Sequence, residues 1–168
     1  GWKPREKEFS VKITHDIDSI RGATLRSLAG DIIKRRDALK AIKTAKQILF
    51  PENDPFLKGC YKLAELSEEY NFRSTFYFMS ASHNNYNSGY DPMTKLVQLC
   101  IDDLRKRDHE VGFHAGYYTF NNMECFLKEK AYMDAALGKT RYGGRQHFLR
   151  FSAPETWRIW EAADLCYD

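Results

Sequence analysis

The stretch FSVKITHDID, residues 9–18, predicts the first strand of the chain and the loop that follows it. Apolar and polar residues alternate from Phe9 to His15, which is typical of a β-strand with one buried face. Residues 16–21 then form the loop at the carboxyl end of that strand. The pattern predicts a strand whose end carries Asp16 and Asp18.

Further strands, each followed by a helix, are predicted along the chain. Short apolar or aromatic runs predict further strands at residues 74–79, 110–114 and 147–151, and the start of a fifth at 165–168. Apolar residues at three- and four-residue spacings predict helices over residues 24–49, 56–70, 93–107, 122–137 and 154–163. Strict alternation of strand and helix predicts an α/β fold with parallel strands, in which ligands bind at the carboxyl ends of the strands.

The composition is that of one globular domain spanning residues 1–168, with 43% hydrophobic and 29% charged residues. A net charge of +3 is too small to indicate a nucleic-acid-binding protein, so we expect no nucleic-acid partner. Apolar runs are short, and the first residues, GWKPREKEF, lack the apolar core of a signal peptide. We therefore expect no transmembrane segment and a cytoplasmic location. The four cysteines form no CxxC pair, which argues against a zinc knuckle or a disulfide framework.

Metal-ligating side chains gather at the predicted strand ends. Asp16 and Asp18 follow the first strand and, two apart in an extended chain, point to the same side. His114 ends the third strand, and Arg145 and His147 flank the start of the fourth. Taken alone, a histidine or an Asp-x-Asp loop is usually structural. Imidazole and carboxylate groups at one sheet edge are typical of a hydrolytic metal site, above all for zinc.

The ordered set of motifs resembles the polysaccharide deacetylase family (NodB-homology domain, carbohydrate esterase family four). The motifs are Thr-His-Asp-Ile-Asp (14–18), Ser-Thr-Phe-Tyr-Phe (74–78), Glu-Val-Gly-Phe-His (110–114) and Gly-Gly-Arg-Gln-His-Phe-Leu-Arg-Phe (143–151). The chain is most similar to the bacterial branch with Thr-His-Asp-x-Asp and Arg-Gln-His-[Tyr/Phe]-Leu-Arg. The resemblance covers nearly the whole chain and implies an irregular (β/α) barrel. That barrel has seven or eight strands, so we expect it to be incomplete here, with this chain as the N-terminal part of a longer domain or as a degenerate member.

The resemblance assigns roles to individual residues. It implies that Asp16 is the catalytic base, that Arg145 braces this base, and that Asp18 and His114 bind a divalent metal ion, Zn²⁺ in our prediction. Tyr118 occupies the position of the family's second histidine, and Asp18 falls one position later than the family's second aspartate. From side-chain chemistry alone, His147 is our candidate for the missing imidazole ligand. The family's late histidine, a general acid, has no counterpart before the end of the chain.

The implied activity is metal-dependent removal of N-acetyl groups from a carbohydrate, either a glycan or a lipid-linked sugar. Tyr117 and Tyr118, beside His114 in a loop, are the predicted substrate-binding residues because aromatic rings stack on sugars. The replacement at Tyr118 favours an alternative, a noncatalytic glycan-binding relative. A third hypothesis is a metallohydrolase that cleaves another C–N bond.

Residues 21–46 carry an unusual concentration of positive charge. Eight basic residues against two acidic ones give this segment +6, while the remainder of the chain is at −3. A basic amphipathic helix can contact an anionic membrane or the phosphate of a lipid-linked glycan. The simpler alternative is a solvated helix face.

Overall fold

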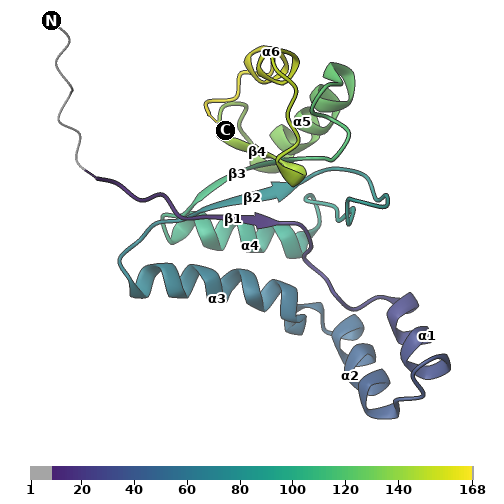
Figure 1. Cartoon of the computed structure of the whole chain (residues 1–168). Coiled ribbons are helices and arrows are strands. Elements are labelled where there is room, and N and C mark those ends of the chain that lie inside the picture. The colour runs from purple at the N-terminus through teal and green to yellow at the C-terminus, as the bar shows by residue number, and fades with distance from the viewer. Residues whose placement is uncertain (1–8, 168) are drawn as a thin grey trace, which may run out of the picture.

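A curled four-stranded sheet forms the centre of the protein, whose computed structural model describes residues 9–167 (Figure 1). Residues 1–8 lie outside this range, and they include most of the N-terminal stretch in which no signal peptide was predicted. The strands are β1 (Thr14–Ile17), β2 (Thr75–Met79), β3 (Glu110–Ala115) and β4 (Gly144–Gln146). They pair in the order β1-β2-β3-β4, and every pair is parallel. The predicted α/β class is confirmed, and the sheet is compatible with part of an α/β barrel.

Helices connect and flank the strands. They are α1 (Leu25–Ile33), α2 (Ala38–Leu49), α3 (Pro55–Glu69), α4 (Lys95–Lys106), α5 (Met123–Leu137) and α6 (Glu155–Ala162), with 3₁₀ turns η1 (Pro51–Asn53) and η2 (His147–Leu149). In Figure 1, α3 and α4 lie below the sheet and α5 and α6 above it, while α1 and α2 form a hairpin that projects away from the sheet. Within the described range, every helix is too short or too polar to cross a bilayer. All four cysteines there are free thiols.

The two faces of the sheet have different roles. Side chains that alternate along the strands, such as Ile17, Phe76 and Phe113, belong to the core that packs against the helices. Paired residues of parallel strands point the same way, and Asp16 pairs with Tyr77 while His114 pairs with Arg145. The polar residues of the predicted site therefore share the face opposite the helix-packed core.

The predicted helix over residues 24–49 is two helices. α1 ends at Ile33, and Arg36 turns the chain with a φ of 50°. The side chain of Asp37 then starts α2 by accepting a hydrogen bond from the Lys40 N–H at 2.9 Å. The apolar periodicity continues across this turn because each helix has its own apolar stripe, so periodicity alone hides the break.

Three strand predictions were misplaced. β1 begins at Thr14 and not at Phe9. The side chain of Phe9 is exposed and so contributes nothing to a buried strand face. The strand predicted at residues 147–151 lies at 144–146, where Gly144 is packed so closely that a Cβ would lie 3.0 Å from the Trp160 ring. This strand has little apolar character, and the apolar residues after it form η2. Residues 165–167 form no strand, although backbone hydrogen bonds join them to residues 142–144.

Candidate metal centre

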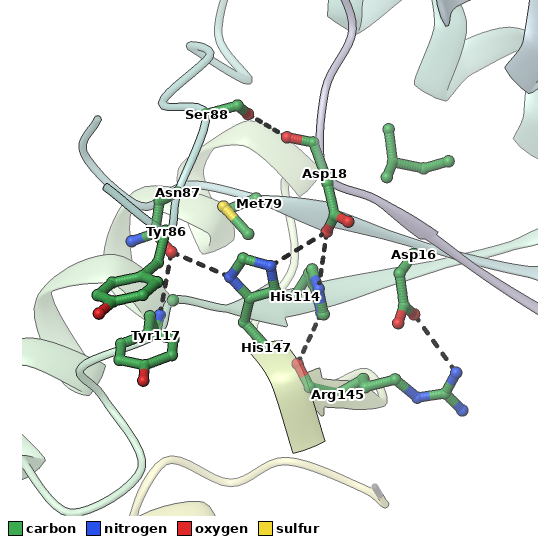
Figure 2. A network of polar contacts seen from close by, with 12 residues as sticks. Asp16, Asp18, Met79, Tyr86, Asn87, Ser88, His114, Tyr117, Arg145 and His147 are labelled. Atoms are coloured by element: carbon green, nitrogen blue, oxygen red, sulfur yellow. Dashed lines mark hydrogen bonds and ion pairs between the residues drawn. The ribbon is translucent and has the colours of Figure 1, made fainter. Parts of the chain in front are cut away.

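The ends of three strands bring Asp18, His114 and His147 together (Figure 2). Asp18 follows β1, His114 lies in β3, and His147 is the first residue after β4. One oxygen or nitrogen of each side chain lies within 4.8 Å of the other two. The Asp18 Oδ1 atom is 3.1 Å from His114 Nε2 and 3.6 Å from His147 Nε2. The cluster has the composition and spacing to hold a metal ion.

The His114 imidazole has one nitrogen fixed and one free. Its side chain is 1% exposed. Nδ1 lies 3.0 Å from the Arg145 carbonyl oxygen, which can only accept, so Nδ1 carries the proton and donates it. Nε2 is therefore the lone-pair nitrogen, and among the described residues it has no hydrogen-bond partner despite its closeness to Asp18. This nitrogen therefore has a lone pair available to bind a cation.

The His147 imidazole is held in the same way by Asn87. Its Nδ1 lies 3.0 Å from the Asn87 Oδ1 atom. The backbone N–H of Tyr117 donates to the same atom at 3.1 Å, which identifies that atom as the oxygen of the carboxamide. Nδ1 of His147 must then donate, and Nε2 is again the lone-pair nitrogen. Burial, followed by the neighbouring His114, lowers the pKa of His147, which favours the neutral, ligating form.

Asp18 supplies the anionic group of the cluster. Its side chain is 59% exposed, so solvent reaches the site from this side. The Ser88 hydroxyl donates to the Asp18 backbone oxygen and ties the end of β1 to the loop that carries Asn87.

The spacing of the Asp18 oxygen to the two imidazole nitrogens is compatible with one metal ion. Ligand atoms about 2.0–2.1 Å from a tetrahedral ion lie about 3.4 Å from one another. The observed separations from Asp18 Oδ1, 3.1 Å and 3.6 Å, lie on either side of this value. Metal-bound histidines in proteins also donate their second ring N–H to an oxygen acceptor, as His114 and His147 do here. The residues present therefore fit a divalent cation.

A carboxylate paired with an arginine lies beside the cluster. Arg145 Nη1 is 3.3 Å from Asp16 Oδ1 and 2.8 Å from the Thr14 hydroxyl, and the guanidinium group lies over the Tyr77 ring. The predicted base and the predicted bracing arginine are thus in contact. Both aspartates and both histidines line one cavity of about 220 Å³, together with Phe148 and Leu149.

A cluster of aromatic side chains packs beside His147, and one of them, Phe148, lines the cavity. Tyr117 stacks on Tyr86 with ring centroids 3.8 Å apart, and Tyr118 and Phe148 contact this pair edge-on. Tyr118 lies outside the ligand cluster and is 51% exposed. Phe148 and Leu149 reach the cavity through positive φ angles of 57° and 52°. Such strain in residues other than glycine often marks functional sites.

Sequence reasoning missed Asn87, Tyr86 and Phe148. The first two lie in the Ser-, Asn- and Gly-rich loop at residues 80–92, whose composition predicts turns and gives no indication of a role in the site. The ring of His15, which precedes Asp16 in β1, packs against Phe76 on the opposite face of the sheet and so points away from the aspartates. Comparisons with protein-family models, with curated proteins and with solved structures gave no match.

Proposed function

We propose that this chain is a metal-dependent hydrolase that removes N-acetyl groups from carbohydrates, with an incomplete barrel of the polysaccharide deacetylase type. One observation carries the proposal. Two buried imidazoles have Nδ1 bound to an acceptor and Nε2 turned toward Asp18, and the Asp16–Arg145 pair borders the same cavity. Metal ligands and a separate carboxylate base are the two parts that hydrolysis of an amide needs.

The protein side chains would divide the work. Asp18, His114 and His147 would hold the ion, which when bound supplies a Lewis acid for the amide carbonyl and lowers the pKa of water. Asp16 would accept a proton from the attacking water. Arg145 would hold the Asp16 carboxylate in position, because a second hydrogen bond to Thr14 fixes the direction of its guanidinium group.

The shape of the site favours a small group on a larger molecule. Its cavity of about 220 Å³ is smaller than the roughly 300–1,000 Å³ of typical small-molecule sites. An acetamido group fits such a space, while the sugar that carries it would lie over the rim formed by Tyr117, Tyr118 and Phe148. Flat aromatic rings at an open edge suit the apolar faces of sugar rings.

Metal binding is tested first, because every later step depends on it. The apo chain is titrated with zinc in competition with a chromophoric chelator, for the wild type and for His114→Ala and His147→Ala. We expect one zinc ion per chain and at least a tenfold weaker affinity in each variant. The control is His83→Ala, since His83 lies in the same loop as Asn87 but outside the ligand cluster. Wild-type affinity in both cluster variants would refute the proposed centre.

Catalysis is tested separately with N-acetylated oligosaccharides and an assay for released acetate. We expect Asp16→Asn to bind zinc as the wild type does and to lose at least 100-fold in rate, since a general base contributes about 10²–10⁴. Zinc binding and saccharide binding without acetate release in the wild type would favour the noncatalytic glycan-binding alternative. If the wild type hydrolyses other amides but releases no acetate from the oligosaccharides, the result would favour a metallohydrolase that cleaves another C–N bond.

A further inference from the structure

The α1–α2 hairpin exposes more apolar surface than a solvated arm requires. Seven large apolar side chains of this segment are each more than half exposed: Leu25, Ile32, Ile33, Leu39, Ile42, Leu49 and Phe50. The hairpin projects from the sheet, and α1 and α2 pack chiefly on each other (Figure 1). Clustered exposed apolar residues of this kind mark interaction sites.

The hairpin is nevertheless held together by buried hydrogen bonds. Asp31, 1% exposed, accepts hydrogen bonds from Thr44 at 2.7 Å and from Arg35 at 2.5 Å, and so links α1 to α2. At the base, the buried Asp54 carboxylate accepts from the backbone N–H groups of Gly22 and other neighbours. The exposed apolar residues are therefore held in place on a fixed scaffold.

Helical geometry puts much of this apolar surface on one side. Asp31 is the buried position of α1, and Ala41 and Thr44 are the buried positions of α2, with Thr44 donating to Asp31 between the helices. At about 100° per residue, Leu25 and Ile32 in α1 lie roughly a quarter turn from Asp31. Ile42 and Leu49 lie a similar angle, in the same rotational sense, from Ala41. Because the two helices run antiparallel, the same sense of rotation places all four side chains on one face of the hairpin.

Positive charge borders this face. Residues 21–50 carry eight basic and two acidic side chains, and one of the acidic ones is the internal Asp31. Lys46 lies between Ile42 and Leu49 on the same stripe of α2, at spacings of four and three residues. Beside α1, a hollow of about 510 Å³ is lined by Arg26, Lys34 and Arg35 together with hydroxyl side chains. Cationic and hydroxyl groups of this kind bind phosphate.

We propose that the α1–α2 hairpin docks on a lipid bilayer that contains anionic phospholipids. The apolar face enters the headgroup region while the basic side chains bind lipid phosphates, which is the arrangement of an interfacial amphipathic helix. Charge complementarity selects this occupant, since two copies of a segment at +6 would repel each other. The inference is independent of the proposed hydrolase activity. It would keep the site near substrates presented at a membrane.

The test is sedimentation of the full chain with vesicles of phosphatidylcholine, with and without added phosphatidylglycerol. We expect binding to the anionic vesicles only, and release at high salt because screening weakens the attraction. Lys46→Glu removes one positive charge and adds a negative one. At about fivefold per charge near an anionic surface, it should lower the partition coefficient about 30-fold. Ile42→Asn should lower it about fivefold through the lost apolar contact.

Matched variants on α4 control for general surface effects. Leu99 is 54% exposed where Ile42 is 55% exposed, and Lys106 lies in the last turn of a 12-residue helix, as Lys46 does. Leu99→Asn and Lys106→Glu should bind vesicles as the wild type does. The proposal would be overturned if the α4 variants lost as much vesicle binding as the hairpin variants. It would also be overturned if the wild type bound vesicles equally well with and without phosphatidylglycerol. A stable dimer in light scattering that Ile42→Asn dissociates would overturn it too, because the hairpin would then be a self-association surface.

Discussion

Replacing Asn87 by alanine tests whether the candidate metal centre depends on its supporting residues. Asn87 is 3% exposed, and its Oδ1 accepts from both the His147 Nδ1–H and the Tyr117 backbone N–H. The alanine variant leaves two buried donors without their acceptor, at about 1–3 kcal/mol each when water cannot replace it. A cavity of about 560 Å³ borders Asn87 and admits water, so we expect the lower end, about 2 kcal/mol in total.

The effect on metal binding has a different cause. Without Asn87, the His147 ring can rotate or take the other tautomer, which presents a protonated nitrogen to the ion. Loss of such an acceptor typically costs 10- to 100-fold in metal affinity, or about 1.4–2.7 kcal/mol. Asn87→Asp keeps an oxygen acceptor in the same place and should bind zinc at least as tightly as the wild type.

The assay combines zinc titration against a competing chelator with thermal unfolding of the apo chain. Asn122→Ala is the control, since Asn122 caps α5 by accepting from the Cys125 N–H at 2.9 Å. Its loss should cost about 1 kcal/mol of stability and leave zinc affinity unchanged. If Asn87→Ala and Asn122→Ala lost stability but bound zinc equally well, the assignment of Asn87 as the support of a metal ligand would be refuted.

Further predictions concern the pH dependence of stability and the packing of the sheet. The ion pair with Arg107, more than any other contact, lowers the pKa of Glu68 to about 2 in the folded chain from 4.5, so its stabilising effect is complete above pH 4.5 and is lost as pH falls toward 2. Between pH 4.5 and 2, the melting temperature of Glu68→Gln should therefore fall less steeply than that of the wild type. Equal slopes of melting temperature against pH for the two chains would contradict this. Gly112→Ala places a Cβ 2.4 Å from the Gly143 backbone oxygen and should destabilise the chain by about 1–3 kcal/mol in denaturant unfolding. At Gly59, inside α3, a Cβ meets nothing within 4 Å, and Gly59→Ala should stabilise by about 0.5–1 kcal/mol; equal effects of the two changes would contradict the packing described.

The sequence predicted the fold class well and some boundaries poorly, for identifiable reasons. Strands β2 and β3 are buried on both faces along nearly their whole length and most of their residues are apolar, so local composition reveals them. β4 is formed by Gly144, Arg145 and Gln146, and its place in the sheet follows from pairing with β3 and from close packing under Trp160. These are contacts between distant parts of the chain, which a local pattern does not contain.

The candidate site divides along the same line. Residues at the carboxyl ends of strands, such as Asp18 and His114, are predictable because parallel topology carries them to one edge of the sheet. Asn87 and Tyr86 reach the site through a loop whose shape depends on its own hydrogen bonds: the Asn84 side chain accepts from the backbone N–H groups of both residues. Their role follows from three-dimensional arrangement and has no periodic signal.

The position of Asp18, two residues after Asp16, has a physical explanation in β1. The strand ends at Ile17, whose side chain belongs to the helix-packed core, so alternation turns Asp16 and Asp18 toward the same cavity. An aspartate at position 17 in this backbone would face the core. His147 obeys the same logic, because Gln146 ends β4 with its side chain buried against Gly116 and the next residue turns to the site. Asp18 and His147 are each the first residue after a strand, whereas His114 lies within β3, and alternation along the chain turns all three side chains toward the same cavity.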